Sequence, residues 1–345
     1  MPVTRFISRM RAAIQPRQPR PVILMYHRVA FARHDPWGLA VDPERFEEQI
    51  AYVKHQRTPM SIDELVDRLR SKTLPENAVA VTFDDGYRDN LVTAKPVLAR
   101  YGVPATLFLA TGFINQKTPF WWDELATMIL ASTQAIREKQ IWPGEAISLD
   151  WGEPERSDIE GGWRVSDESR TARQNSYLAI WRKLQRATAE DREVAMNTLR
   201  RHLGTAQDPM TRPMNSDEID ALLSDGLVEL GAHTVTHPAL TLLSRPESRR
   251  EIEGSGQRCR ELASKCVNGF AYPYGDMSSE VRSDVARLGF SWACSTEGRF
   301  VDVKQPDFYA LPRVAVLNAP IGESLVEHRR LSAGDGESQK KLPMG

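Results

Sequence analysis

The chain has 345 residues, of which 45 are basic, 46 are acidic and 41% are hydrophobic. This length suits one large domain or two ordinary ones, and the near-zero net charge gives no electrostatic reason to expect binding to nucleic acid or to a membrane surface. The cysteines Cys259, Cys266 and Cys294 form no Cys-x-x-Cys pair, which argues against a disulfide framework and against a cysteine zinc site.

The first twenty residues are basic and lack the apolar run of a signal peptide. We expect a basic N-terminal tail over 1–20, with a short amphipathic helix as the alternative. No stretch is long and apolar enough for an integral membrane span. These features together predict a cytoplasmic location.

Strand and helix patterns alternate over 21–114, the first part of the predicted domain. The continuous apolar run Ala78–Phe83 is typical of a strand buried on both faces. The other elements expected in this part are strands at Val22–Tyr26 and Ala105–Leu109 and helices at Pro43–His55, Ile62–Arg70 and Asn90–Tyr101.

Residues 115–215 differ from what precedes them, with many charges and long helical patterns at 170–188 and 190–203. They hold six of the eight tryptophans, namely Trp121, Trp122, Trp142, Trp151, Trp163 and Trp181. We interpret this segment as a Trp-rich, mostly helical insertion.

The alternation resumes over 216–320, and the Gly-, Ser- and Lys-rich tail 321–345 is expected to be disordered. Strands are predicted at Val228–Leu230, Gly269–Tyr272, Ser291–Cys294 and Ala310–Val316, and helices at Ser216–Ser224, Arg245–Lys265 and Ser278–Leu288. Repeated strand–helix units favour a parallel α/β barrel over an open sheet. In such a barrel the chemistry lies where the strands end, at their carboxyl side.

Two adjacent carboxylates, Asp84 and Asp85, come directly after the predicted strand Ala78–Phe83. Since successive strand residues point to opposite faces, the two can serve separate functions, and Gly86 then lets the backbone turn. The alternative is structural: Asp-Gly is a common turn signal, and Asp85 or Asp89 could cap the next helix.

His233 and His237 follow the predicted strand Val228–Leu230 at a spacing of four. On a helical turn both imidazoles would share a face and could reach one cation, although surface or hydrogen-bonded histidines are commoner. With Asp85 they make three ligands, the number that a catalytic zinc-type site needs. A divalent cation would offset the repulsion between Asp84 and Asp85 and leave Asp84 ionised to take a proton from the attacking water.

Three motifs, in this order, resemble those of a known family: TFDDG at 82–86, HTVTH at 233–237 and FAYPYGD at 270–276. The family is the polysaccharide deacetylases, the NodB-homology enzymes of carbohydrate esterase family 4. The resemblance covers roughly 20–115 and 216–320. It implies a deformed (β/α)7 barrel with a helical insertion, and removal of N- or O-acetyl groups from sugars with a divalent metal, usually Zn2+.

The resemblance also implies roles for individual residues. Asp84 corresponds to the base, and the metal ligands correspond to Asp85, His233 and His237. Tyr274 would supply a backbone N–H to the oxyanion, in a turn that Pro273 stiffens and Gly275 opens; an ordinary surface turn is the alternative.

The chain departs from the family pattern at two positions. An arginine that usually orients the base is replaced by Ala271, and no Leu-x-His follows residue 290 to supply the general acid. His27, at the end of the first strand, could protonate the leaving amine, and Arg313 could orient Asp84. Alternatively, His27 makes a structural hydrogen bond and Arg313 pairs with a structural acid.

The insertion is expected to cover part of the barrel mouth. Trp121 and Trp122 could stack on sugar faces or fill the core of the added helices, and Asp123 is most simply the N-terminal residue of the helix that follows.

The predicted function is therefore a metal-dependent hydrolase that removes acetyl groups from a polysaccharide or a glycan precursor, with an acetylated carbohydrate as its partner. Two alternatives stay open. One is a carbohydrate-binding pseudoenzyme or scaffold that keeps the metal site, and the other is an amidohydrolase on a small non-sugar amide or ureido compound. The sequence gives no oligomeric state.

Overall fold

The computed structural model describes residues 20–132, 136–138, 149–168, 170–204 and 211–325. The predicted tail over 1–20, apart from its last residue, lies outside this part of the chain, as do Trp142 and the tail beyond 325. None of the described helices is long and apolar enough to cross a membrane.

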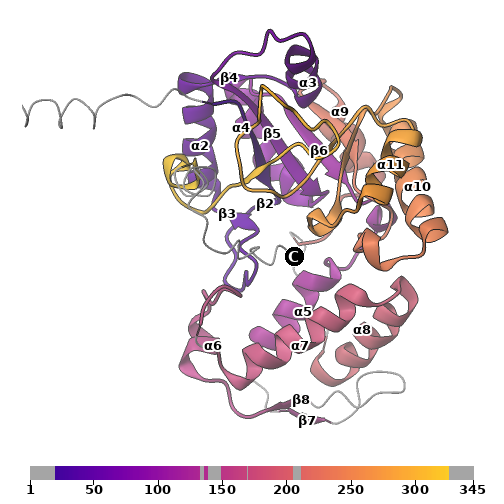
Figure 1. Ribbon diagram of the computed structural model, residues 1–345. Helices are drawn as coiled ribbons and strands as arrows, with labels where there is room; N and C mark the ends of the chain where they lie inside the picture. The colour runs from indigo at the N-terminus through magenta and orange to yellow at the C-terminus, as the bar shows by residue number, and fades with distance from the viewer. Residues whose placement is uncertain (1–19, 133–135, 139–148, 169, 205–210, 326–345) are drawn as a thin grey trace, which may run out of the picture.

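The centre of the molecule is a parallel sheet that curves into a barrel (Figure 1). Its strands follow the order β11-β10-β9-β6-β5-β1-β12, and β4 pairs with β5 outside this path. Every pair in this sheet is parallel. Their bounds are β1 Val22–Tyr26, β4 Thr58–Pro59, β5 Ala78–Asp85, β6 Ala105–Leu109, β9 Val228–Ala232, β10 Gly269–Ala271, β11 Trp292–Cys294 and β12 Val314–Ala315. A bridge between Cys294 and Leu311 brings the two edges together, as expected for a deformed barrel.

Amphipathic helices cover the outside of this barrel. Helix α10 shows how the sequence sets one of them: Ser244 and Glu247 form a capping box at its start, and Ile252 and Cys259 are buried on one face. The covering helices are α2 Pro43–Gln56, α4 Lys95–Tyr101, α9 Ser216–Leu223, α10 Arg245–Ala263 and α11 Ser279–Arg287. A π-helical turn, η1, covers Asn90–Ala94 ahead of α4.

The barrel interior has a core of its own. Side chains of Ile23, Ala80 and Phe108 cluster there with helix α3, Ile62–Arg70, while their strand neighbours Leu24 and Val81 join the outer core. This alternation follows from the two-residue period of a strand. In Figure 1, α3 lies at one end of the barrel, so the other end, where the strands finish, is left to the insertion.

The insertion forms a lobe over that second end (Figure 1). Its elements are α5 Trp121–Leu130, the antiparallel pair β7 Ile136–Glu138 and β8 Leu149–Trp151, α6 Arg156–Glu160, α7 Ala172–Arg186 and α8 Ala189–Leu203. Trp121, Trp122, Trp151 and Trp181 are all buried in its own hydrophobic cluster. The structure therefore confirms both the deformed (β/α)7 barrel and the helical insertion.

Two predicted boundaries are wrong. Residues 321–325 are helical and bury Ile321 and Leu325 in the outer core, so this part of the predicted tail is ordered by apolar contacts. The strand expected over Ala310–Val316 is confined to Val314–Ala315, because Leu311 bridges to β11 whereas Val314 and Ala315 pair with β1, so the backbone changes partner between them. The division of the chain into its five predicted segments otherwise stays a prediction.

Candidate metal and catalytic site

The structure brings Asp85, His233 and His237 together at the carboxyl ends of β5 and β9. One ligand atom from each lies within 4.8 Å of the others, and all three side chains are buried. The Asp85 Oδ1 atom lies 3.3 Å from His237 Nε2 and 3.7 Å from His233 Nε2. The cluster therefore has the size and the donor types of a site for one divalent cation.

The expectation that the two histidines sit on a helical turn is wrong. Residues 233–237 form an irregular loop after β9, in which Thr234 has φ 64° and His237 has φ 55°. This left-handed backbone, together with a hydrogen bond from His237 N–H to Thr234 Oγ1, turns both imidazoles toward Asp85. A spacing of four thus produces neighbours here through loop geometry rather than helix geometry.

Backbone strain concentrates at this site. Of the seven described non-glycine residues with positive φ, four lie here, namely Asp85, Thr234, His237 and Tyr274. Each such conformation costs on the order of 1–3 kcal/mol. Asp85 shows what this conformation achieves. By strand alternation its side chain would point to the face opposite that of Asp84. The φ of 73° at Asp85 turns the chain so that the carboxylate faces His233 and His237.

The donor atoms fit a metal ion. His233 Nδ1 lies 2.8 Å from the Ala271 carbonyl, a contact that places the proton on Nδ1 and leaves Nε2 free to bind a cation. Asp85 Oδ1 and His237 Nδ1 are buried without a hydrogen-bond partner in the described part of the chain. Burial, then the nearby Asp84 and Asp123 carboxylates, raises the pKa of Asp85 well above its usual range. Burial lowers the pKa of His233 and His237, which keeps both imidazoles neutral.

Asp84 points into the barrel and meets Arg313. The guanidinium makes two parallel hydrogen bonds to the carboxylate, of 2.6 and 2.7 Å, and donates further to Thr82 Oγ1 and the Ser295 carbonyl. Burial alone would raise the pKa of Asp84, but Arg313 and then His233 lower it below the usual value. Arg313 thereby keeps the Asp84 carboxylate ionised and fixes its orientation. It does so from a position other than 271, where this chain has an alanine in place of the family's arginine.

We expect Arg313→Lys to lower kcat about 10- to 100-fold, because an ammonium cannot make the bidentate contact that holds Asp84. Since Arg313 lowers the pKa of Asp84, weakening the contact should move the acidic limb of the kcat/KM profile to higher pH. Acetate release measured across pH tests both effects. Arg68→Lys, at an exposed position on α3, is the matched control, and an unmoved acidic limb would contradict the assignment.

Two further predicted residues line the same cavity. Tyr274 has φ 59° in the short turn Pro273–Gly275, and its ring centroid lies 4.6 Å from that of His237. A Cβ at Gly275, itself at φ 65°, would meet Thr296 Oγ1, so this turn needs its glycine. His27 is half-buried at the end of β1, where burial lowers its pKa to about 4 despite the opposing effect of Asp84.

A carboxylate that sequence reasoning missed holds the histidine loop from behind. Glu251, on α10, accepts hydrogen bonds from the N–H groups of Val235 and Thr236 and from Thr236 Oγ1, all at 2.8 Å. From the opposite side Arg192, on α8, donates to the Thr236 carbonyl at 3.3 Å. Both are helix residues without any local motif, so only the packing of the helices shows their function.

We expect Glu251→Ala to weaken metal affinity about 10- to 100-fold, because a methyl group cannot accept the hydrogen bonds from the loop N–H groups. The free energy of unfolding should also fall by about 1–3 kcal/mol. Chelator competition and thermal unfolding measure the two effects. Glu253→Ala, on the exposed face of the same helix, is the control; equal affinities in the two variants would argue against a role of Glu251 in holding residues 233–237.

The insertion builds one wall of the cavity above these residues. The cavity, about 500 Å³ including space open to solvent, lies between the metal cluster and a wall of Trp37, Trp121, Trp122 and Trp181. The Trp122 ring centroid lies 5.0 Å from that of His237, so this indole packs directly against a ligand. Trp121 and Trp122 are thus both core residues of the insertion and part of the cavity wall. Trp37 lies in the loop after the short strand β2, Arg28–Val29, and no pattern in the sequence pointed to it.

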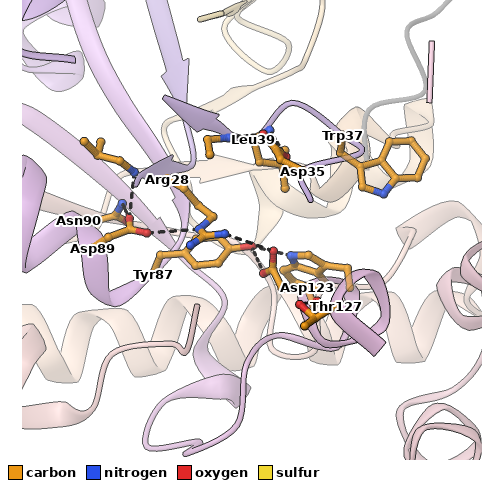
Figure 2. Close-up of polar contacts among 12 residues, drawn as sticks. Arg28, Asp35, Trp37, Leu39, Tyr87, Asp89, Asn90, Asp123 and Thr127 are labelled. Carbon is orange, nitrogen blue, oxygen red and sulfur yellow. Dashed lines mark hydrogen bonds and ion pairs between the residues drawn. The ribbon is translucent and has the colours of Figure 1, made fainter. Parts of the chain in front are cut away.

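Asp123 lies in the first turn of α5 but is not its N-terminal residue as predicted, since the helix begins at Trp121. It is the third residue of α5, and its carboxylate accepts a 2.6 Å hydrogen bond from the Tyr87 hydroxyl and lies 3.7 Å from Arg28, which also pairs with Asp89 (Figure 2). The Trp122 N–H donates to the same hydroxyl at 2.6 Å. Burial raises the pKa of Asp123 to about 6, opposed by Arg28 and Tyr87. This network joins the insertion to the barrel next to the site.

Comparisons with known proteins agree with this geometry. The family model "Polysaccharide deacetylase" matches residues 71–137 and 194–293. The Bacillus subtilis (strain 168) protein YxkH is 33% identical over 99 residues, 28% of this chain and 33% of its own length. The poly-beta-1,6-N-acetyl-D-glucosamine N-deacetylase of Escherichia coli (strain K12) is 22% identical over 90% of this chain and 39% of its own length. The chain thus spans between a third and two fifths of these two relatives.

Among solved structures, the Streptococcus pyogenes deacetylase PplD, in complex with acetate, superposes with a TM-score of 0.56 at 17% identity. The match covers 90% of this chain and 97% of PplD. At this level of identity the likeness concerns the fold, and it agrees with the deformed barrel. The motifs, the family model and the fold lead to one conclusion: residues 71–137 and 194–293 form parts of a polysaccharide deacetylase domain of the NodB type.

Proposed function

We propose that the chain is a metal-dependent hydrolase that removes acetyl groups from N-acetylated sugars of a polysaccharide or a glycan precursor. The observation that carries this proposal is the Asp85–His233–His237 cluster, with the Arg313-bound Asp84 beside it in one cavity. The curated relatives support the bond class, since the Escherichia coli protein is named an N-deacetylase of a poly-N-acetylglucosamine.

Asp85, His233 and His237 would hold the cation, which we propose to be Zn2+ from the one-carboxylate, two-imidazole donor set. When bound, a divalent cation supplies Lewis-acid chemistry: it polarises the acyl carbonyl and makes water more acidic.

The chain's own residues would then perform the proton transfers. Asp84, ionised and oriented by Arg313, takes the proton from the attacking water, a contribution of about 100- to 10,000-fold. The backbone N–H of Tyr274 stabilises the tetrahedral oxyanion; one such donor is worth about 3–4 kcal/mol. His27 lines the same cavity; since burial lowers its pKa to about 4, we propose that it first takes up the proton that Asp84 removed from the water and then passes it to the departing amine.

The test is metal analysis of the purified protein together with acetate release from a panel of acetylated glycans and small acetamides. We expect about one divalent ion per chain and release from the N-acetylated sugars, abolished by chelation. Bound metal without release from any member would favour a pseudoenzyme or scaffold. Release from the small acetamides alone would favour an amidohydrolase with a non-sugar substrate.

A further inference from the structure

Three hydrogen-bond donors in the cavity wall have no acceptor. The Trp121 Nε1, Trp181 Nε1 and Tyr274 hydroxyl atoms are buried without a partner among the described residues; we refer to these three side chains as the donor cluster. All three line the cavity that also contains the metal cluster. An unpaired buried donor costs free energy, so three in one cavity call for an acceptor supplied from outside the chain.

The absence of a partner is selective. Two other indoles of the same wall are paired: the Trp37 N–H donates to the Tyr177 hydroxyl at 2.8 Å, and the Trp122 N–H donates to the Tyr87 hydroxyl at 2.6 Å. The fold therefore satisfies the donors that fix the wall and leaves the donor cluster free to bind something else.

The donor cluster is continuous and reaches the proposed reaction centre. The Trp181 ring centroid lies 6.1 Å from that of Trp121 and 6.2 Å from that of Tyr274, and Tyr274 in turn lies 4.6 Å from His237. The rings are held by further contacts, with Trp37 at 4.1 Å from Trp181 and the Arg192 guanidinium at 5.0 Å from Trp121. Because Tyr274 belongs to the donor cluster and its ring packs against His237, a ligand that hydrogen-bonds to this cluster lies beside the metal cluster.

The chemistry of the wall indicates a neutral ligand with many oxygens. No arginine or lysine lines the cavity in the described part of the chain, so away from the proposed cation an anion would find no counter-charge in the wall. Aromatic faces beside N–H and O–H donors suit a ring that has apolar C–H faces and hydroxyl oxygens at its edge.

We propose that the donor cluster is a subsite for the hydroxyl oxygens of the acetylated sugar, built largely by the insertion. This assignment rests on the proposed deacetylase function and extends it: the insertion contributes to recognition of the sugar beyond its acetyl group. The site then selects hydroxylated substrates over simple acetamides.

Trp181→Phe and Tyr274→Phe test this, since each removes one donor on a different element: Tyr274→Phe keeps the ring, and Trp181→Phe replaces the indole by a smaller aromatic ring without a donor. The probes are β-1,4- and β-1,6-linked tetramers of N-acetylglucosamine, with KM and kcat from acetate release and Kd from calorimetry in the Asp84→Asn background. Each variant should raise KM and Kd about three- to tenfold, more than it lowers kcat. Trp163→Phe is the matched control, because the Trp163 N–H is also buried and unpaired but lines a separate cavity.

The outcomes separate the two proposals. Equal Kd values in Trp181→Phe, Tyr274→Phe and Trp163→Phe would overturn the subsite while leaving the deacetylase function in place. Binding that weakens in the first two variants, without acetate release from the parent, would support the subsite and overturn the deacetylase. If the parent neither binds nor hydrolyses the tetramers, both proposals fail.

Discussion

Asp84→Asn should reduce acetate release by at least about 100- to 10,000-fold while the protein still binds its metal ion. The amide cannot accept a proton from water, but Asp84 is not one of the three clustered ligands. Its loss also leaves Arg313 buried opposite a neutral group, and breaking a buried ion pair in this way costs about 3–5 kcal/mol of unfolding free energy. Single-turnover acetate release, metal content and thermal unfolding measure the three effects.

The matched control is Asp67→Asn, whose side chain is 78% exposed on the helix at the opposite end of the barrel. It should match the parent in all three measurements. An Asp84→Asn protein that is folded, metal-loaded and as active as the parent would exclude Asp84 as the base and would point to another group in the cavity.

His237→Ala should lower metal affinity by more than about 100-fold and abolish turnover with it. Removing a group that only orients a metal ligand already weakens metal affinity about 10- to 100-fold, whereas this variant removes one of the ligands. Because His237 also packs between Trp122 and Tyr274, a small cavity should destabilise the loop slightly as well. Chelator competition gives the affinity, and zinc added in excess should restore only part of the activity.

His55→Ala provides the comparison, since His55 is an exposed histidine on α2, away from the cavity. Its metal affinity should equal that of the parent. Equal, tight binding of one ion by both variants would mean that the ion is held elsewhere, and the three-residue site would have to be abandoned.

Much of the barrel and the position of the site could be predicted because parallel strands obey a simple rule. Their carboxyl ends meet at one edge, so Asp84, Asp85, His233 and Arg313 could be expected to lie close together although as many as 229 residues separate them. Continuous apolar runs marked the strands, and the motif order marked the family.

What could not be predicted depends on packing between elements far apart in sequence. Glu251 and Arg192 lie on amphipathic helices whose charged positions all look alike, and only the docked helices show which of them reach residues 233–237. An acidic residue in the first turn of a helix is common, so nothing in the sequence around Asp123 indicates its pairing with Arg28, 95 positions away. The left-handed backbone of His237 likewise arises from contacts around the loop rather than from the residue type.

The pairing of β12 with β1 has a consequence for how the protein is made. Within the described part of the chain β1 is the first strand to be synthesised and its neighbour β12 is the last, and Arg313 comes just ahead of β12. Until then Asp84 lacks the guanidinium that pairs with it, and the edge of β1 that β12 covers stays unpaired. Nascent chains that stop short of β12 should therefore stay open and depend on chaperones, and folding should be slow because this closing contact is so distant in sequence.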